Sequence, residues 1–342
     1  MKKFFVVLCV FLLACCVFTG TATMVASAQS TSAKSAVVME KNSCRVLYEK
    51  NSHHKLPMAS TTKIVTALTV LQNSATDKVV EIPREACGIE GSSVYLTAGE
   101  HFTVEQLLYG LMLRSGNDCA VALALTVGGS VQGFAEMMND TAASLGCCES
   151  NFKNPHGLPD DNHYTSAYDL AVITCAALKN KEFQKIVSTK SVRISNDGKE
   201  RVWTNKNKLL SSYDGADGVK TGYTKKAGRC FVGSATKNGM QVVVVVLNCG
   251  PMFEDTAKLL DYAFANYSLR VAVPENKLCG VVYERGKPTY YYCSEGFSYP
   301  LKEGEQLKCN VVLQEDKQQI EVYLGDSCVF RRNLTAQTQF GR

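Results

Sequence analysis

The sequence predicts an α+β protein in which helices cover an antiparallel sheet and form a helical subdomain, followed by a small all-β domain. Three observations lead to this prediction. Segments with the period of two that is typical of strands lie near both ends of the first 270 residues. Helical periodicity fills the region between them. From about Val271 the pattern changes to short β-type segments separated by glycine-containing turns.

The N-terminus has the pattern of a secretory signal peptide over residues 1–28. A short basic start precedes an apolar run at 4–17, and small residues at 26–28 form a cleavage site. An uncleaved membrane helix is disfavoured because the apolar run is short for a bilayer. A lipoprotein cleaved at Cys15 is also disfavoured, since too little apolar sequence would precede it. The mature chain is therefore expected to be secreted and associated with the cell wall.

The first domain is expected over residues 29–270, and its strands come from both ends. Residues 36–39 and 44–48 predict a hairpin that leads into the helix after Ser60. Residues 230–235 and 241–247 predict a second hairpin. Its run of five valines is too apolar for an exposed strand, so this strand should be central. Lys220-Thr221-Gly222 belongs to a further strand, expected at an edge that substrate can approach.

The middle of this domain is expected to be helical. Residues 64–71 are apolar on every side, which predicts a buried helix. A helical pattern at 105–113 ends at Gly116 and resumes at 119–126, so Ser115 and Asn117 are expected on the loop between two helices. Three more helices are expected, at 131–145, 165–178 and 256–265.

Residues 271–342 are expected to form a small β-sandwich-like domain without chemistry of its own. The last residues, from Phe330 to Arg342, have only a weak apolar face. We therefore expect no strong membrane anchor once the signal peptide is removed.

Composition argues against several classes of function. The formal charge is +5, or +3 without Lys2 and Lys3, and acids and bases are mixed along the chain, so no nucleic-acid surface is expected. Three of the fifteen cysteines lie in the signal peptide. The other twelve form no Cys-x-x-Cys or Cys/His cluster, so we expect no metal or other cofactor. Most of these cysteines are expected to be small core residues.

Ser60 and Lys63 have the spacing of a nucleophile and its base. Ser60 stands where the buried helix begins, and Lys63 follows at i+3 on the same helical face, within reach of the hydroxyl. A buried ammonium is costly to keep charged, so burial lowers the pKa of the amine and lets the neutral form act as a base. A serine nucleophile needs such a base.

The spacing alone is weak evidence, because Ser-x-x-Lys occurs four times, at Ser52, Ser60, Ser150 and Ser234. Ser60 is singled out by two further motifs elsewhere in the chain. The chain has one Ser-x-Asn, at 115–117, and one Lys-Thr-Gly, at 220–222. In this order the three motifs resemble the signature of class A β-lactamases and penicillin-binding proteins.

The whole mature chain resembles the D-alanyl-D-alanine carboxypeptidases, which are low-molecular-weight penicillin-binding proteins and serine peptidases. This resemblance implies a β-lactamase/transpeptidase-like fold for the first domain. Four further stretches look like family sequence: residues 57–63, 95–100, 154–158 and 163–171.

The resemblance implies three catalytic residues. Ser60 would attack the carbonyl of the penultimate D-alanine, Lys63 would take the hydroxyl proton, and Ser115 would relay a proton to the departing amine. Hydrolysis of the acyl-enzyme by water would complete the reaction. His156 invites a triad interpretation, but with Lys63 as the base a structural role is favoured.

The resemblance also implies five binding residues. Asn117 would bond the substrate backbone, Lys220 would add positive charge, and Thr221 would bind the terminal carboxylate. The N–H of Tyr223, with that of the nucleophile, would form the oxyanion hole, and Gly222 would let substrate lie close to the strand. The expected ligands are the peptidoglycan stem peptide ending in D-Ala-D-Ala and the β-lactams that imitate it.

One departure from the family concerns the residues that would bind the terminal carboxylate of the substrate. Many members have an arginine shortly after the last core strand, but residues 248–255 contain none and include two acids. Thr221, Lys220 and the backbone beside them remain as carboxylate ligands, with Arg229 as a further basic candidate.

Three rival functions remain. A class A β-lactamase would need a Glu-x-x-Leu-Asn deacylation loop, which the sequence lacks, and would have no extra β domain. A DD-endopeptidase that cuts D-Ala cross-links is chemically close to the carboxypeptidase. A catalytically silent wall-binding module would have no use for four intact residues of this kind: Ser60, Lys63, Ser115 and Lys220.

Overall fold

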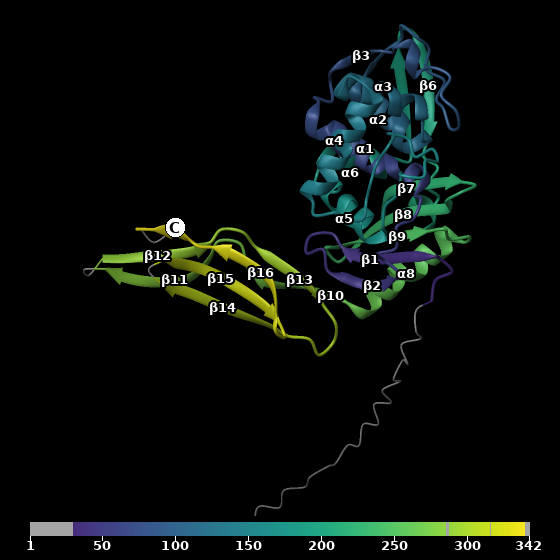
Figure 1. Cartoon of the computed structure of the whole chain (residues 1–342). Helices are drawn as coiled ribbons and strands as arrows, with labels where there is room; N and C mark the ends of the chain where they lie inside the picture. The colour runs from purple at the N-terminus through teal and green to yellow at the C-terminus, as the bar shows by residue number, and fades with distance from the viewer. Residues whose placement is uncertain (1–29, 285–286, 315, 339–342) are drawn as a thin grey trace, which may run out of the picture. The chain divides into compact units, whose positions relative to one another are not determined.

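The computed structural model describes residues 30–284, 287–314 and 316–338. The expected signal peptide at 1–28 lies outside these residues. The fold is the predicted α+β arrangement, with helices against an antiparallel sheet and a C-terminal all-β region (Figure 1).

The main sheet has five strands in the order β2-β1-β9-β8-β7, so it is built from both ends of the first region. The strands are β1 (Ser35–Glu40), β2 (Val46–Lys50), β7 (Ala216–Thr224), β8 (Gly228–Lys237) and β9 (Met240–Leu247). β9 pairs with both β1 and β8, which confirms the valine-rich strand as central. β7 is an edge strand and carries Lys220, as predicted.

Alternate side chains of β9 reach two different cores. Val243 and Val245 pack in the large cluster with helix α1, whereas Val242 and Val244 pack in a second cluster with helix α8. Every residue of β9 is buried. An uninterrupted apolar strand therefore follows from having helices on both faces of the sheet.

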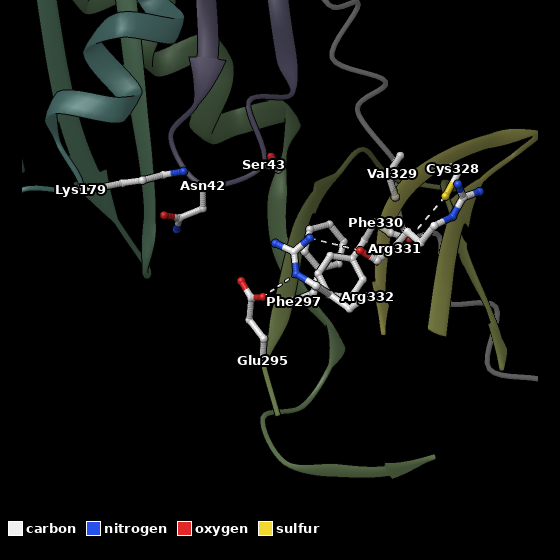
Figure 2. Close-up of a pocket in the computed structure, with 10 residues that line it drawn as sticks. All are labelled: Asn42, Ser43, Lys179, Glu295, Phe297, Cys328, Val329, Phe330, Arg331 and Arg332. Atoms are coloured by element: carbon white, nitrogen blue, oxygen red, sulfur yellow. Dashed lines mark hydrogen bonds and ion pairs between the residues drawn. The ribbon is translucent and has the colours of Figure 1, made fainter. Parts of the chain in front are cut away.

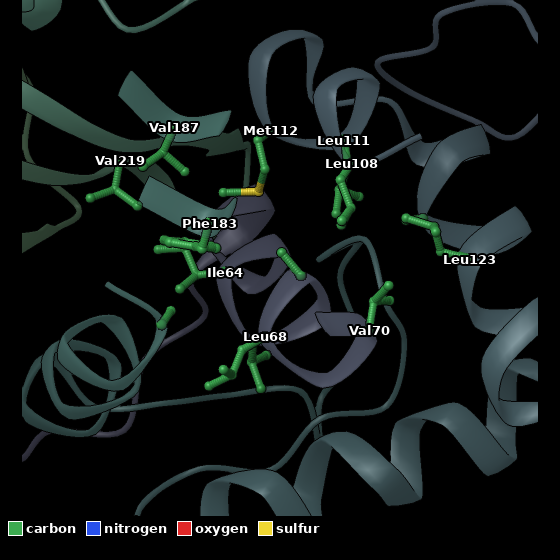
Figure 3. Close-up of a cluster of buried hydrophobic side chains, with 14 of the residues drawn as sticks. Ile64, Leu68, Val70, Leu108, Leu111, Met112, Leu123, Phe183, Val187 and Val219 are labelled. Carbon is green, nitrogen blue, oxygen red and sulfur yellow. The ribbon is translucent and has the colours of Figure 1, made fainter. Parts of the chain in front are cut away.

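Eight helices are described: α1 (Lys63–Asn73), α2 (Val104–Tyr109), α3 (Asn117–Gly128), α4 (Val131–Ser144), α5 (Ala167–Ala177), α6 (Lys181–Ser188), α7 (Leu209–Ser212) and α8 (Met252–Asn266). Helix α1 is buried from Lys63 through Val70, which confirms the prediction from its apolar sequence. Figure 3 shows Ile64 and Leu68 of α1 within the large cluster that also contains Leu108, Met112 and Phe183.

Two helix limits differ from the predictions. The helix expected to end at Leu113 is α2 followed by a π-helical turn, η3 (Gly110–Arg114), and α3 begins at Asn117. Asn117 is thus the first residue of a helix and not a loop residue. Helix α8 starts one turn before the expected Thr256, because Pro251 precedes it in a position where proline is tolerated.

Smaller elements surround the helical part. They are the 3-10 turns η1 (Ala59–Thr62) and η2 (Arg84–Ala86), the pair β3 (Val79–Glu81) and β4 (His101–Thr103), and the hairpin β5 (Ser191–Asn196) and β6 (Lys199–Thr204). Within the described residues no single helix is long and apolar enough to span a membrane. The bent pair α3 and α4 passes that test only when both helices are taken together.

The C-terminal region consists of strands: β10 (Ser268–Val273), β11 (Lys277–Glu284), β12 (Lys287–Cys293), β13 (Phe297–Leu301), β14 (Leu307–Gln314), β15 (Lys317–Leu324), β16 (Ser327–Asn333) and β17 (Thr335–Gln337). Its small core includes Phe297 stacked on Phe330 with ring centroids 4.3 Å apart, and Arg332 pairs with Glu295 beside them (Figure 2). The predicted boundary between the two domains, at residue 270, lies within β10, and it stays a prediction.

All twelve cysteines beyond the predicted signal peptide are free. Six are buried and three are partly buried, which agrees with their expected role as small core residues. The other three, Cys148, Cys309 and Cys328, are exposed.

Candidate active site

Ser60 lies on a tight turn that leads into α1. The turn is the 3-10 helix η1, in which Ala59 has a positive φ of 51°. The side chains of Thr61 and Thr62 donate to the carbonyls of Met58 and Ala59, at 2.6 and 2.8 Å. These bonds hold the predicted nucleophile on rigid backbone at the start of a buried helix.

A loop after α4 packs against this turn. Gly157 has a φ of +89°, and a Cβ there would lie 2.0 Å from the carbonyl oxygen of Ala59. Only glycine allows both the conformation and the approach. This contact explains why the Asn-Pro-His-Gly stretch is needed: it brings the carbonyl of His156 to Lys63.

Lys63 is fully buried and its amine makes three polar contacts. Nζ lies 3.1 Å from Ser60 Oγ, 2.7 Å from Asn117 Oδ1 and 2.7 Å from the carbonyl oxygen of His156. An amide oxygen and a backbone carbonyl can only accept hydrogen bonds. They take two N–H groups of the amine, which as an ammonium donates its third to Ser60 Oγ and as a neutral amine keeps its lone pair for the hydroxyl hydrogen of Ser60.

The surroundings of Lys63 favour this neutral form. Burial lowers the pKa of Lys63 well below its ordinary value, and the positive charge of Lys220 lowers it further. The two direct acceptors, Asn117 and His156, are uncharged groups that do not stabilise an ammonium as a carboxylate would.

Ser115 and Asn117 are placed by the turn between the π-helical segment and α3. Ser115 adopts the left-handed conformation with φ 65°, a rare one for a residue with a side chain. The N–H of Gly116 donates to the carbonyl of Gly110 at 3.1 Å, and the side-chain amide of Asn117 donates to the carbonyl of Glu90 at 2.5 Å. The amide oxygen of Asn117 is thereby turned toward Lys63.

β7 passes beside the nucleophile turn. Lys220 is 1% exposed, its amine donates to the carbonyl of Thr221 at 2.8 Å, and burial followed by the charge of Lys206 lowers its pKa to about 7. A Cβ on Gly222 would lie 3.0 Å from the amide nitrogens of Ser60 and Thr61. Gly222 thus allows close contact between the strand and the nucleophile turn, and its predicted role in letting substrate lie close to the strand stays a prediction.

One pocket collects most of the predicted residues. It is lined by Ser60, Ser92, Ser115, Lys206, Thr221, Gly222, Tyr223, Arg229, Met252 and Phe253. The other three predicted residues, Lys63, Asn117 and Lys220, lie buried behind it. Larger hollows in the structure contain none of the predicted site residues.

Sequence reasoning missed four lining residues: Ser92, Lys206, Met252 and Phe253. Ser92 comes shortly before a stretch that looked like family sequence, which is a weak signal. Lys206 stands between two asparagines and no motif marks it. Its amine donates to Ser92 Oγ at 3.1 Å, and burial lowers its pKa.

The other three Ser-x-x-Lys pairs are engaged elsewhere. Ser52 donates to Glu49, Ser150 to Asp169 and Ser234 to Asp217. Lys55 lies over the ring of Tyr164, and Lys237 lies over that of Tyr213. Ser60 and Lys63 are therefore distinguished by geometry as well as by their accompanying motifs.

Two histidines near the site have lowered pKa values, which favour the neutral form, and their hydrogen bonds fit a structural role. His163 Nδ1 accepts from the N–H of Lys153, so its Nε2–H faces the hydroxyl of Thr62 at 2.8 Å. His156 Nδ1 accepts from the N–H of Leu158. Burial lowers the pKa of His163 to about 4 and that of His156 to about 3. Among the described residues, no group of three or more His, Cys, Asp and Glu side chains could hold a metal ion.

The chain is similar to known D-alanyl-D-alanine carboxypeptidases. The peptidase S11 family model, described as D-alanyl-D-alanine carboxypeptidase, matches residues 22–250. The chain is 36% identical over 287 residues to D-alanyl-D-alanine carboxypeptidase DacF of Bacillus subtilis, covering 80% of this chain and 74% of DacF. It is 35% identical over 241 residues to DacB2 of Mycobacterium tuberculosis, covering 68% and 82%.

Solved structures show the same fold. The DD-transpeptidase of Streptomyces K15 superposes with a TM-score of 0.66 at 35% identity, covering 69% of this chain and 98% of that one. DacD of Francisella tularensis superposes with a TM-score of 0.70 over 90% of this chain and 95% of that one. At 23% identity, this second likeness concerns the fold alone.

Proposed function

Because the chain belongs to the peptidase S11 family of D-alanyl-D-alanine carboxypeptidases, we propose that it is a serine-type enzyme that removes the terminal D-alanine from peptidoglycan pentapeptide stems through an acyl-enzyme on Ser60. The observation that carries this proposal is the contact of Ser60 Oγ with the buried amine of Lys63 at 3.1 Å. In the neutral amine, the bonds to Asn117 and His156 use both N–H groups and leave the lone pair for the hydroxyl.

Acylation begins with transfer of the Ser60 hydroxyl proton to Lys63 Nζ as Oγ bonds to the carbonyl carbon of the penultimate D-alanine. The backbone N–H groups of Ser60 and Tyr223 receive the developing oxyanion. When the C–N bond breaks, the proton passes to the departing amine with Ser115 as relay. Lys63 is then neutral again and can accept a proton from the water that hydrolyses the ester.

The remaining groups orient the substrate. Asn117 bonds the peptide backbone, while Thr221, with the charge of Lys220 behind it, receives the terminal carboxylate. Arg229 lines the same pocket and supplies the exposed cation that the segment after β9 lacks. The reaction needs no metal or cofactor, since the base, the relay and the oxyanion donors are all protein groups.

We also propose that the protein acts outside the cytoplasmic membrane, at the cell wall, as its N-terminal signal pattern indicates. β-Lactams present a similar carbonyl and carboxylate and would acylate Ser60 for longer. Fractionation of cells tests the location: mature protein in the medium or wall fraction is expected, and release from washed membranes only by detergent would contradict it.

The test of the function is labelling with a fluorescent penicillin, together with release of D-alanine from a peptide ending in D-Ala-D-Ala. We expect one label per chain, on a peptide containing Ser60, and loss of both label and release in Ser60→Ala. Ser52→Ala is the matched control from an unrelated Ser-x-x-Lys pair and should behave as wild type. Label that persists in Ser60→Ala would overturn the assignment.

A further inference from the structure

Asp118, the second residue of α3, is a buried carboxylate that accepts hydrogen bonds from several residues of one loop. It is 0% exposed, and it accepts from the hydroxyl of Ser93 at 2.5 Å, from the N–H of Val94 at 3.0 Å and from the N–H of Leu96 at 3.1 Å. It also accepts from the N–H of Cys119 at the start of its own helix, at 2.9 Å. Among the described residues no Lys, Arg or His forms an ion pair with it, so its direct partners are these hydrogen-bond donors.

The loop that Asp118 gathers is the same loop that holds Asn117. The N–H of Asn117 donates to the carbonyl of Ser92 at 2.7 Å, and its side-chain amide donates to the carbonyl of Glu90. Gly91 lies between these two carbonyls with φ +90°, and a Cβ there would be 2.8 Å from Asn117 Nδ2. The position of the loop therefore decides where the amide oxygen of Asn117 points.

The backbone of this loop is strained at Tyr95. Tyr95 has a φ of +61° and is 83% exposed, so its own side chain gains nothing from the conformation. A strained residue persists only where its surroundings hold it. Here the bonds to Asp118 fall on both sides of Tyr95, and its N–H donates to Ser93 Oγ at 2.9 Å.

We propose that Asp118 is a positioning residue for acylation: its carboxylate folds residues 92–96 against the start of α3, and the carbonyls of Glu90 and Ser92 then hold Asn117 so that Oδ1 faces the amine of Lys63. This inference rests on the proposed function of Lys63 as the base. Asp118 contacts neither substrate nor Ser60 and acts only through Asn117 and through its charge.

The charge has a separate effect on Lys63. The titratable groups that act on or face Lys63 are Lys220 from β7, Lys206 from the segment before α7, Asp118 and Cys119 from α3, and His156 and His163 from the loop before α5. Asp118 is the carboxylate of this set, and its negative charge raises the pKa of Lys63, against burial and Lys220. Neutralising it should lower that pKa further and extend the neutral form of Lys63 to lower pH.

The experiment measures the rate constant of acylation by a fluorescent penicillin as a function of pH in the full chain. We expect Asp118→Asn to lower the plateau at least tenfold, because an amide cannot accept from all of these donors. We also expect the acid limb of the profile to move to lower pH. Ser93→Ala removes one donor and leaves the charge, so it should lower the plateau less and leave the limb in place.

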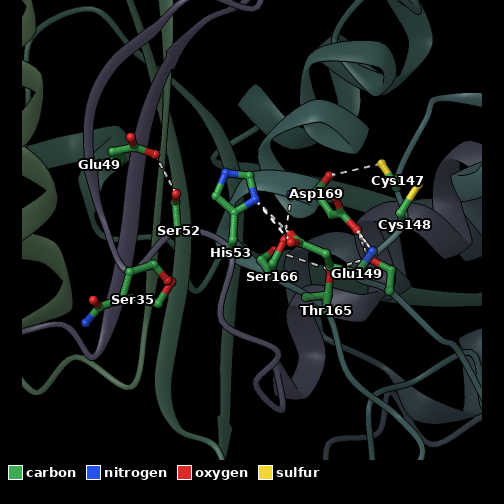
Figure 4. A network of polar contacts seen from close by, with 12 residues as sticks. Ser35, Glu49, Ser52, His53, Cys147, Cys148, Glu149, Thr165, Ser166 and Asp169 are labelled. Carbon is green, nitrogen blue, oxygen red and sulfur yellow. Dashed lines mark hydrogen bonds and ion pairs between the residues drawn. The ribbon is translucent and has the colours of Figure 1, made fainter.

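Asp169 supplies the matched control. It is the third residue of α5, 2% exposed, and it gathers a loop in the same way by accepting from the N–H of Glu149 at 2.7 Å and from Ser150 Oγ at 2.8 Å. Figure 4 shows Asp169 turned toward Glu149, in a network that contains none of the site residues. Asp169→Asn should reduce thermal stability without changing the plateau or the acid limb.

A folded Asp118→Asn with an unchanged plateau and limb would overturn the inference, as would an equal loss of rate in Asp169→Asn. If Asp118→Asn does not fold by circular dichroism, Ser93→Ala decides, and an unchanged plateau there counts against the proposal. Failure of the proposed function is distinguishable, because wild-type protein would then take no label at all.

Discussion

Gly222 of β7 and Ser60 are packed backbone to backbone: a Cβ on Gly222 would lie 3.0 Å from the amide nitrogen of Ser60. The same Cβ would be 3.0 Å from the amide nitrogen of Thr61 and 3.1 Å from the carbonyl oxygen of Met58. The edge strand and the nucleophile turn therefore set each other's position. Both proposed oxyanion donors, on Ser60 and Tyr223, depend on this contact.

Gly222→Ala should separate the strand from the turn by a few tenths of an ångström, because no flexible side chain is available to move aside. We expect acylation to slow by about a hundredfold, the scale seen when reacting groups are misplaced. Gly250→Ala is the control, since a Cβ there meets nothing within 4 Å. Stopped-flow labelling measures both variants, and a rate for Gly222→Ala like that of Gly250→Ala would contradict the argument.

Lys63→Arg should abolish acylation. A guanidinium stays protonated at any accessible pH, so it has no lone pair for the hydroxyl proton of Ser60. In the wild type burial lowers the pKa of Lys63, which favours the base form, and the rate should fall as acid protonates that form. A pH profile of labelling between pH 4 and about 9 checks both statements. Activity in Lys63→Arg would exclude Lys63 as the base.

Lys220→Met should stabilise the protein while reducing its activity. The pKa of Lys220 is about 7 in the folded state against an ordinary value of 10.5, so between these values the unfolded chain holds the extra proton. Above pH 10.5 the amine is neutral in both states and does not lower the free energy of unfolding. As the pH drops from 10.5 toward 7, the unfolded chain binds the proton first, so the free energy of unfolding decreases. Removing the amine should raise the melting temperature at pH 7 by roughly 5 °C and flatten its pH dependence between pH 7 and 10.

Calorimetry across this pH range measures the effect. Lys237→Met serves as the control, because Lys237 lies over an aromatic ring at the far end of β8 and no buried amine is removed. A melting temperature of Lys220→Met that falls at pH 7 would show that the bond from Lys220 to the carbonyl of Thr221 outweighs the cost of burial.

Arg229→Met should weaken binding of the terminal carboxylate. Arg229 lines the pocket with Thr221, and its guanidinium is oriented by a bond to the carbonyl of Gly250 at 3.1 Å. We expect KM for a D-Ala-D-Ala peptide to rise about tenfold to a hundredfold, the size of a charge-assisted bond. Esters without that carboxylate should be affected little. Equal changes on both substrates, or a similar change in Arg270→Met on β10, would remove Arg229 from this role.

Much of the fold is predictable because the local pattern and the tertiary structure agree. The valines of β9 predicted a central strand, and the apolar run after Lys63 predicted a buried helix. The start of α3 was less predictable, because Gly116 is a strong local signal for a break. The π-helical turn before it allows the chain to resume a helix directly at Asn117.

The candidate site was predictable where a motif marks it and not where the fold alone supplies a residue. Ser60, Ser115 and Thr221 lie in one pocket, as their motifs suggested. Lys206 reaches the pocket from a segment without any pattern, and no sequence motif marked Asp118. The contact of Gly222 with the nucleophile turn was not predicted, since a glycine's neighbour across the fold cannot be identified from its sequence.

The position of β1 beside β9 also constrains the order of folding. Ser35 pairs with Leu247, so β1, which pairs with β2 on one side, finds its partner on the other side only after the chain has been made as far as residue 247. Contacts so distant in sequence form slowly and late. A nascent or truncated chain that ends before β9 contains Ser60, Lys63 and Ser115 but lacks the sheet that supports them. Hydrolytic activity should therefore appear only in one step, when the last strand of the sheet is in place.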